Sequence, residues 1–443
     1  MSPSTYDIVI SGAGVAGLSA ACVLGEAGFD VLCVDPSAPV TEQDSAGADL
    51  RTTAILQPGR RVLEEAGVWE RLGGAPSALQ VMRIIDAGGV EPVPRVVREF
   101  DAADISDQPF GWNVPNWLLR REMLARALQF TNVELRMGVA VSGLLTRESE
   151  ARVRLSDGST ARCRLVVAAD GRASPVREAV GIPVRTTRYG QKALACVVTH
   201  AEPHHNVSTE IHRSGGPFTL VPLPDRNGLP CSAVVWMERG AEAQRLASLS
   251  QTAFEAEMTT RSCGIMGPLR LASKRSLWPL ISQLAARMSA QRVALVAEAA
   301  HAVPPIGAQG LNMSLADISA LLDLARADVD GVGNAAMLQD YHTARHSEVA
   351  LRVAGIDMLN RASMADDQLL RDARARGLDA FYGLAPVRKM LMQLGAGRAQ
   401  QHGLRSIVLP IRLRRIDNGP RRFDRFGKKT LVTACDGCFG SDP

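Results

Sequence analysis

The sequence predicts an α/β (α+β) fold: a domain built on a parallel sheet, an inserted domain built on an antiparallel sheet, and a C-terminal helical segment. Two observations predict it. Short apolar runs at 8–10, 165–169 and 293–297 are each followed by a polar or glycine-rich loop and a helical pattern, as expected for parallel strands buried on both faces. Residues 190–240 contain β-type runs separated by Gly, Pro and Asn, which indicates antiparallel strands.

Length and composition favour a globular protein of two domains with a helical appendage, since 443 residues are too many for one simple core. The formal net charge is only +4, which argues against a nucleic-acid partner. No apolar run approaches the length of a membrane span, and the fold begins without a signal peptide. Eight scattered cysteines show no framework spacing, so we expect a cytoplasmic protein.

Residues 6–35 contain, in order, a strand, a glycine-rich turn, a helix and a second strand. Gly12, Gly14 and Gly17 have G-x-G-x-x-G spacing. The first glycine allows a tight turn, the second lets the backbone approach a pyrophosphate, and the third lets the helix lie close to the strand. Asp35 ends the second strand and is placed to accept hydrogen bonds from a ribose. The segment predicts a dinucleotide site but does not separate FAD from NAD.

Two further segments place polar groups near strand ends. After the hairpin signal Asp157-Gly158, the apolar run 165–169 stops at Asp170-Gly171. Open α/β sheets bind ligands at this edge, although a capped turn before a short helix is the alternative. Arg51 precedes a helix that begins near Pro58; it could be a surface residue or could reach the phosphates of a cofactor.

The segment 293–317 repeats the pattern of an apolar strand followed by an acid-bearing loop and a helix. Its apolar strand ends at Glu298, a Pro/Gly-rich loop follows, and Ser314 and Asp317 have the S-x-x-D spacing of a helix cap. Three strands therefore end in acid-bearing loops that could converge on one extended ligand.

Together these segments resemble the FAD-dependent aromatic hydroxylases of the para-hydroxybenzoate hydroxylase fold, and among them the ubiquinone-biosynthesis hydroxylase branch. The resemblance covers roughly residues 5–400. It rests on GAGVAG at 12–17, Asp49-Leu50-Arg51, Asp170-Gly171, GWNVPNWLLRREMLARAL at 111–128, GPFTLVPLP at 216–224 and AEAAHAVPPIGAQGLN at 297–312. It implies a Rossmann-like FAD-binding domain of residues 1–75, 111–180 and 280–360, an inserted antiparallel-sheet substrate domain of residues 76–110 and 181–279, and C-terminal helices with a basic tail at 361–443.

The resemblance also implies FAD as the cofactor, with NAD(P)H as a transient reductant, because the chain has one complete dinucleotide fingerprint. The implied FAD contacts are Gly12, Gly14, Ala16 and Gly17 at the pyrophosphate, Asp35 at the ribose, Arg51 and Arg121 near the phosphates, Asp170 at FAD and the nicotinamide donor, and Glu298, Pro305, Gly307, Gly310, Leu311 and Asn312 along the ribityl chain and flavin ring.

The chain departs from the family pattern in the last of these loops. The family usually has Gly-Asp where this chain has Ala297-Glu298, and Gly-Gln where it has Ala308-Gln309. A Glu can still accept a hydrogen bond from a ribityl hydroxyl, but its extra methylene must be accommodated. We expect FAD to bind more weakly, but still to bind.

The histidines predict no metal site. His204, His205 and His212 lack a Cys or carboxylate at a recognisable spacing, so we expect surface or sheet-face positions. His301 supports the cofactor loop in the family, and a catalytic base is the alternative. The sequence assigns no catalytic residue.

The C-terminal tail carries a weaker signal. Residues 405–429 contain nine Arg or Lys and two Asp among apolar residues, a mixture that could contact an anionic membrane surface or a partner protein. A frayed, solvated tail is the alternative. Cys435 and Cys438 form one C-x-x-C pair, which cannot close a tetrahedral zinc site within one chain.

The function implied by the resemblance is that of a flavin monooxygenase. NAD(P)H would reduce FAD, O2 would give a flavin C4a-hydroperoxide, and an electron-rich phenol would attack its distal oxygen. We expect a polyprenylated phenol on the route to ubiquinone, and therefore peripheral contact with the inner face of the membrane. The alternatives are a soluble phenol as substrate, or a weakly flavin-binding scaffold subunit of a quinone-biosynthesis complex.

Overall fold

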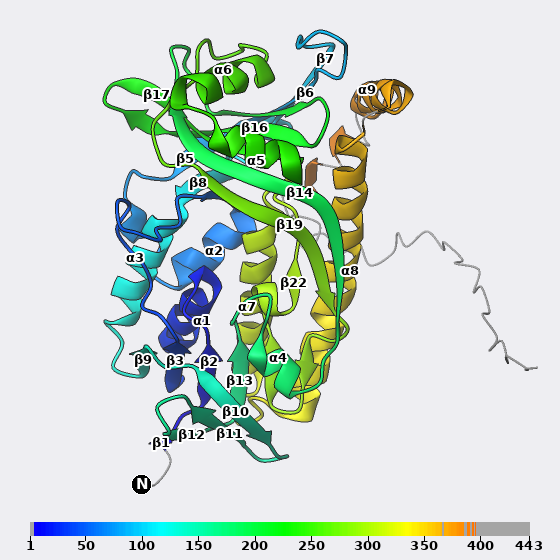
Figure 1. Cartoon of the computed structure of the whole chain (residues 1–443). Helices are drawn as coiled ribbons and strands as arrows, with labels where there is room; N and C mark the ends of the chain where they lie inside the picture. The colour runs from blue at the N-terminus through cyan, green and yellow to red at the C-terminus, as the bar shows by residue number, and fades with distance from the viewer. Residues whose placement is uncertain (1–3, 366, 385–387, 390–391, 394, 396–443) are drawn as a thin grey trace, which may run out of the picture. The chain divides into compact units, whose positions relative to one another are not determined.

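The computed structural model describes residues 4–365, 367–384, 388–389, 392–393 and 395. Met1–Gln401 cluster into one compact unit, whose sheets and helices are drawn in Figure 1. The basic segment 405–429 and the pair Cys435 and Cys438 lie outside the described residues. Within the described part of the chain, no helix is both long enough and apolar enough to cross a membrane.

A mainly parallel sheet carries the N-terminal motif. In spatial order its strands are β20 (Ser289–Ala290), β21 (Val293–Leu295), β13 (Leu165–Ala168), β2 (Ile8–Ser11), β3 (Val31–Asp35) and β9 (Val133–Met137). Neighbours from β21 to β9 are parallel, and α1 (Val15–Glu26) is the crossover between β2 and β3. Within the apolar runs that predicted these strands, residues 8–10, 165–168 and 293–295 are fully buried, as expected for a sheet covered on both faces.

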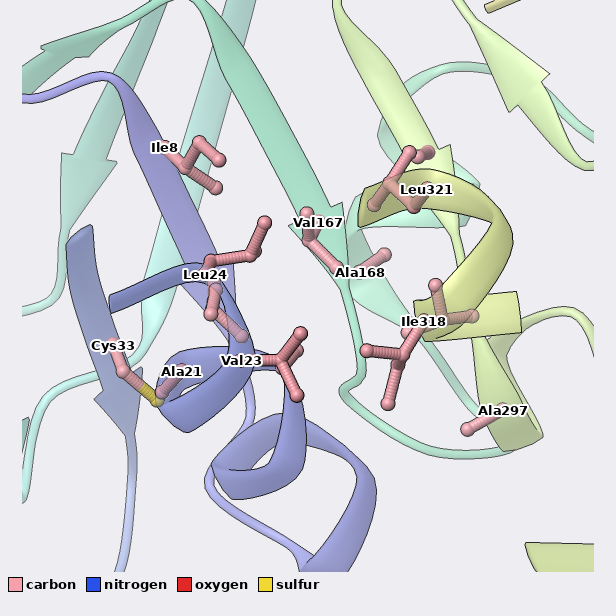
Figure 2. Close-up of a cluster of buried hydrophobic side chains, with 14 of the residues drawn as sticks. Ile8, Ala21, Val23, Leu24, Cys33, Val167, Ala168, Ala297, Ile318 and Leu321 are labelled. Carbon is pink, nitrogen blue, oxygen red and sulfur yellow. The ribbon is translucent and has the colours of Figure 1, made fainter. Parts of the chain in front are cut away.

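The main core lies between this sheet and the helices packed on it. Figure 2 shows Val23 and Leu24 of α1 close to Ile8 of β2. It also shows Ile318 and Leu321 of α7 (Gln309–Ala327) near β13. These side chains are at most 1% exposed, so α1 and α7 are held against the strands that carry the acidic loops.

A large, mainly antiparallel sheet forms above it in the view of Figure 1. Its strands, in spatial order, are β22 (His301–Ala302), β19 (Ser276–Ala285), β14 (Val184–Thr199), β17 (Leu229–Arg239), β16 (Pro217–Arg226), β15 (Val207–His212), β6 (Val81–Asp86) and β7 (Val96–Asp101), with β18 (Arg270–Leu271) paired to β14. The antiparallel sheet expected from residues 190–240 is therefore present. Strands β6 and β7, which precede the other strands of this sheet in the sequence, pair at its edge.

One face of the large sheet is covered by α5 (Gly240–Ser248) and α6 (Gln251–Arg261), as Figure 1 shows. Phe218 and Trp236 from neighbouring strands meet Phe254 of α6 in a buried apolar cluster. The opposite face of the sheet is turned away from these helices and is less fully covered at its centre.

The remaining elements connect these parts. The smaller sheets consist of β1 (Ser4–Thr5), β12 (Thr160–Cys163), β11 (Ala151–Leu155) and β10 (Val141–Thr146), and of β4 (Thr52–Leu56), β8 (Gly111–Pro115) and β5 (Ser77–Leu79). The other helices are α2 (Gln57–Glu65), α3 (Asn116–Ala127), α4 (Pro175–Ala179), α8 (Ala335–Ser363) and α9 (Gln368–Gly383), with 3-10 turns η1 (Glu70–Leu72), η2 (Ala102–Asp104) and η3 (Ala297–Ala299). The predicted hairpin at Asp157-Gly158 joins β11 to β12.

The predicted cap of the helix after the third loop is wrong. The helix α7 begins at Gln309, so Ser314 lies inside it and its Oγ donates to the Gly310 carbonyl oxygen at 3.0 Å. Asp317 is fully buried and binds groups from other elements. The S-x-x-D spacing arises here from a serine bonded back along the helix and an aspartate used in tertiary contacts.

Candidate cofactor site

Three acidic side chains lie at one edge of the parallel sheet. Strands β21, β13, β2 and β3 are adjacent, and their carboxyl ends meet there. Asp35 is the last residue of β3, Asp170 follows β13 and Glu298 follows β21. The acids that the sequence places in three separate segments are thus neighbours in the fold, at the edge where such sheets bind ligands.

The glycine turn between β2 and α1 is closed on one side and open on the other. Gly12 has φ +105, and a Cβ there would lie 2.4 Å from the Ala169 carbonyl oxygen. A Cβ on Gly17 would lie 1.8 Å from the Gly12 carbonyl oxygen, so the helix packs directly on the turn. A Cβ on Gly14 would meet no atom within 4 Å. The turn has the shape of a cradle with free space beside the second glycine.

Asp35 braces this turn. Its Oδ2 accepts a hydrogen bond from the Ala13 N–H at 2.7 Å, and its Oδ1 accepts one from the Ser37 N–H at 2.8 Å. Ala16, half-buried, stands in the first turn of α1, whose N-terminus has no side-chain cap. The N–H groups at this helix end therefore remain available to an anionic group.

Asp170 holds a buried oxygen without a partner. Its Oδ2 accepts from the Ser11 hydroxyl at 3.3 Å and from the Val176 N–H at 3.2 Å. Its Oδ1 is buried and has no hydrogen-bond partner among the described residues. Burial raises the pKa of Asp170, and hydrogen bonds, led by that of Ser174, offset this only in part. A hydroxyl of a bound molecule would satisfy the unpaired oxygen. The capped-turn alternative also holds locally, since Ser174 caps α4.

Glu298 is held by an arginine that the sequence analysis did not single out. Arg172 Nε lies 3.1 Å from Glu298 Oε2, and Arg172 Nη2 lies 3.1 Å from Glu298 Oε1. This ion pair joins the loop after β13 to the loop after β21. Arg172 directly follows Asp170-Gly171, so its place next to a predicted site residue was the available signal.

Arg51 lies in the same region. It forms a two-pronged ion pair with Asp49, with both N–O distances 2.7 Å, and its guanidinium lies 5.4 Å from the ring centroid of Trp278. The hydrogen bond to Asp49 raises the pKa of Arg51, and the charge of Glu298 adds to the shift. Arg51 and Glu298, two predicted site residues far apart in the sequence, are therefore close enough in the fold for their charges to interact.

The two arginines of α3 point to different partners. Arg120 Nη2 lies 3.5 Å from Asp49 Oδ2, on the side of Arg51. Arg121, the predicted cofactor contact, is exposed; its Nε donates to Glu122 at 2.9 Å, and its guanidinium lies 5.3 Å from the Trp117 ring centroid. In this arrangement Arg120, not Arg121, joins the group of charges near Asp49.

The loop from 297 to 308 begins and ends with an alanine in a left-handed conformation. Ala297 has φ 54 and Ala308 has φ 56, a region that strongly favours glycine. These are the two positions where the chain departs from the family pattern. Pro305 and Gly310 are exposed in this segment, whereas Gly307 and Leu311 are half-buried.

A buried ion-pair network holds the start of this loop. Asp317 accepts hydrogen bonds from the Ala297 N–H at 3.1 Å, His301 Nε2 at 2.6 Å and Arg345 Nε at 2.9 Å. Burial alone would raise the pKa of Asp317, but the charges of His301 and Arg345 and their hydrogen bonds outweigh it, and the pKa is lowered. His301 is 2% exposed and its Nε2 binds Asp317, which fits the loop-support interpretation.

A second group of contacts holds the end of the loop. Arg352 of α8 donates to Gln309 Oε1 at 2.8 Å, and Gln309 Nε2 donates to the Gly307 carbonyl at 2.8 Å. Asn312, a predicted cofactor residue, uses its Nδ2 for the Ala54 and Ala308 carbonyls, each at 2.7 Å. Its side chain thus ties α7 to β4 and to the loop.

The centre of the large sheet presents an apolar, incompletely covered face near this loop. Ile306 packs in a cluster with Ala193 and Met237, and Val235 and Trp278 pack against that cluster. Val235 is only half-buried although β17 is a central strand. Among the residues the structure describes, no group of three His, Cys, Asp or Glu side chains is arranged to hold a metal ion.

Comparison with known proteins decides the family. Residues 5–354 match the model of the FAD binding domain family. The chain belongs to this family. The ubiquinone hydroxylase UbiL of Rhodospirillum rubrum is 33% identical over 394 residues, which cover 88% of this chain and 89% of the relative. The 3-demethoxyubiquinol 3-hydroxylase of Escherichia coli is 25% identical over 407 residues, which cover 90% of this chain and 100% of the relative.

Solved structures share the fold of this FAD-binding family member. The p-nitrophenol 4-monooxygenase PnpA of Pseudomonas putida aligns with a TM-score of 0.72 and 19% identity, covering 89% of this chain and 99% of that one. PqsL of Pseudomonas aeruginosa, in complex with 2-aminobenzoylacetate, aligns with a TM-score of 0.69 and 23% identity, covering 85% of this chain and 100% of that one. The predicted fold class is confirmed. The chain is a flavin monooxygenase with FAD as its cofactor.

The residues at the sheet edge fit FAD. The open space at Gly14 suits a pyrophosphate, and the unpaired Asp170 oxygen suits a hydroxyl. Both features are what an extended cofactor with a diphosphate and hydroxyl groups requires. Sequence reasoning missed Arg172 and Arg345, and for Arg345 no local signal exists, since its partner Asp317 lies on another helix.

Proposed function

We propose that this flavin monooxygenase hydroxylates a polyprenylated phenol in ubiquinone biosynthesis, with NAD(P)H as the reductant. The apolar face of the large sheet beside the loop at Ile306 carries this proposal, because it suits a lipophilic aromatic molecule held next to the cofactor loop. The names of the relatives from R. rubrum and E. coli, both ubiquinone-pathway hydroxylases, support it.

Each residue of the sheet edge has a proposed task. The backbone at Gly12 and Gly14 and the N-terminus of α1 would hold the FAD pyrophosphate. Asp35 would accept from the ribose, in addition to bracing the turn. Asp170 would accept a hydroxyl hydrogen at its unpaired Oδ1. Bound FAD, once reduced, supplies the activation of O2 that lets one oxygen atom pass to the ring.

The protein's further contribution is position and the exclusion of water. Met237 and Ile306 are buried together, and Trp278 lies between their cluster and the guanidinium of Arg51. A substrate ring against these side chains would be shielded from solvent. The exclusion of water would keep the oxygen activated at the cofactor from being lost before it reaches the ring. Arg51, fixed by Asp49, would face the cofactor from the same side.

Two broader proposals complete the assignment. Residues 1–75, 111–180 and 280–360 would serve FAD, whereas 76–110 and 181–279 would serve the substrate. The composition of 405–429 supports contact with an anionic membrane surface, where a prenylated substrate would reside.

The test starts from the purified full-length chain. We expect a visible flavin spectrum, bleaching by NADH or NADPH, faster bleaching with a prenylated phenol, and one atom of 18O2 in the product by mass spectrometry. Colourless protein that takes up no added FAD would support the scaffold alternative. Equal turnover of a prenylated and an unprenylated phenol would favour a soluble substrate.

A further inference from the structure

A glutamate and a histidine lie on the same face of the large sheet as the apolar cluster. Along β15, Thr209 and Ile211 are buried, and Ile211 belongs to the core beneath α5 and α6. Glu210 and His212 alternate with them and therefore project from the opposite face. Across the sheet, Glu210 is paired with Thr219 of β16.

This row of side chains leads to the apolar cluster. Thr219 is paired in turn with Val235 of β17, which packs against the cluster containing Ile306. Two strand spacings, about 10 Å, separate Glu210 from Val235. Thr219 and Val235 are both half-buried in the middle of the sheet, so the face between Glu210 and the cluster is incompletely covered.

Glu210 and His212 form a polar pair at the end of this row. His212 Nε2 lies 2.8 Å from Glu210 Oε1, and the two side chains are only 16% and 14% exposed. His212 Nδ1 is buried and has no hydrogen-bond partner among the described residues. Because the carboxylate can only accept, Nε2 donates to it, and Nδ1 of the neutral ring is left as an acceptor.

We propose that His212 Nδ1 is the acceptor for the phenolic hydroxyl of the aromatic substrate, with Glu210 as its positioning residue. This deepens the proposed function and rests on it. A buried acceptor without a donor is costly, and a substrate hydroxyl supplies the donor. The carboxylate of Glu210 holds the ring in one tautomer and stabilises the imidazolium that forms when the proton is taken.

The proton step is balanced within the site. The O–H bond of the phenol breaks, its proton moves to Nδ1, and the electron pair stays on the phenolate oxygen. That pair raises the electron density of the ring, which would then form a C–O bond to one atom of the O2 activated by reduced FAD as the O–O bond breaks. As the ring regains aromaticity, its own hydrogen leaves as a proton to the second oxygen atom, which ends as water, and Nδ1 returns the first proton to the phenolic oxygen of the product.

The charged neighbours of the pair are already compensated. Asp86 of β6 is paired with His212 in the sheet register and lies on the same face. Its carboxylate is held by Arg95 at 2.6 Å and by Arg374 of α9 at 2.8 Å. Glu210 is therefore the carboxylate that contacts the His212 ring.

The experiment compares a phenol with its methyl ether. Calorimetric titration of the full-length, FAD-loaded protein with 2-allylphenol and 2-allylanisole measures the two dissociation constants. Wild type should bind the phenol more tightly. His212→Phe should weaken phenol binding about tenfold and leave the ether unchanged, because only the phenol donates a hydrogen bond. Glu210→Gln should weaken phenol binding by a smaller factor.

A rate measurement separates binding of the ring from chemistry at the flavin. At saturating phenol, His212→Phe should lower product formation about 100-fold, the loss typical of a removed general base. Anaerobic flavin reduction by NAD(P)H should not change. His205→Asn, at an exposed turn position with φ 49, is the matched histidine control and should behave as wild type.

Several results would overturn the proposal. These are wild type that binds the phenol no more tightly than the ether, a His212→Phe protein that loses both ligands equally, or unchanged phenol binding in both variants. If His212→Phe does not fold, Glu210→Gln decides by the same comparison. If the wild-type protein takes up no FAD, the proposed function fails, whereas titration of the flavin-free protein still tests the hydroxyl contact.

Discussion

Arg172 and Glu298, 126 positions apart in the sequence, form a two-pronged ion pair with both N–O distances 3.1 Å, and this pair joins the loops that follow β13 and β21. The carboxylate that replaces the family's aspartate is therefore neutralised by a neighbour from the Asp-Gly loop. The side chain of Glu298 reaches Arg172 from the loop after β21.

Removing Arg172 should weaken FAD binding. Arg172→Ala leaves the charge of Glu298 uncompensated at the edge where the cofactor diphosphate would lie, so we expect the dissociation constant for FAD to rise about fivefold. The measurement is a flavin fluorescence titration at low and high salt, since screening should reduce the effect. Stability should fall by less than about 1 kcal/mol, because the pair is partly exposed.

The double variant provides the control. Arg172→Ala with Glu298→Gln removes both charges and should restore FAD affinity most of the way to wild type. An equal loss in the single and the double variant would show that Arg172 acts on FAD directly and not through Glu298.

Replacing Ala297 or Ala308 by glycine should stabilise the fold. An L-residue in the left-handed region costs about 1–2 kcal/mol. A glycine avoids that cost, but it loses more chain entropy on folding, which offsets about 0.5–1 kcal/mol of the gain. We expect Ala297→Gly and Ala308→Gly each to stabilise the fold by up to about 1 kcal/mol, measured by chemical unfolding. Ala299→Gly, in the same 3-10 turn as Ala297 but without a positive φ, should destabilise. Equal changes at 297 and 299 would contradict the strain argument.

Asp317→Asn should destabilise strongly. The substitution removes the buried carboxylate that accepts from Arg345 Nε and His301 Nε2 and leaves Arg345 with Glu348 alone, so we expect a loss of about 3–5 kcal/mol at neutral pH. Asp323→Asn on the same helix is the control. Burial raises the pKa of Asp323, so its charge adds no stability at neutral pH and its loss should be neutral or slightly stabilising.

The difference in unfolding free energy between wild type and Asp317→Asn should become smaller as the pH falls. The pKa of Asp317 is lowered below its usual 3.8, so its stabilising effect is complete above about that pH and is lost as the pH falls through the lower, folded-state value. Unfolding free energies measured from pH 7 to pH 3 should converge only at the acid end. Convergence near pH 6 would contradict the assignment to Asp317.

Two glycines of the first turn should separate folding from cofactor binding. The Cβ introduced by Gly14→Val would meet no atom within 4 Å, so the protein should fold normally but lose FAD, because the side chain fills the cradle. Gly17→Ala places a Cβ 1.8 Å from the Gly12 carbonyl and should disrupt folding itself. Circular dichroism and flavin absorbance together distinguish these outcomes. A Gly14→Val protein that retains FAD would show that the pyrophosphate does not bind at this turn.

The sequence by itself determined the parallel sheet, the glycine turn and the acids at the strand ends. These features are local: apolar runs select buried strands, and glycine spacing sets the turn and the approach of the helix, so Gly12, Gly14, Gly17 and Asp35 could be placed without tertiary contacts.

Only the tertiary structure decided which charges meet. The pairs of Arg172 with Glu298 and of Asp317 with Arg345, and the register that places Glu210 beside Thr219, depend on the packing of separate elements. The structure also decided that α7 begins at Gln309: Ser314 lies inside the helix and bonds back to Gly310, and Asp317 binds His301 and Arg345 from other elements. Sequence spacing constrains neighbours along the chain, whereas contacts between distant segments follow from how buried surfaces fit together.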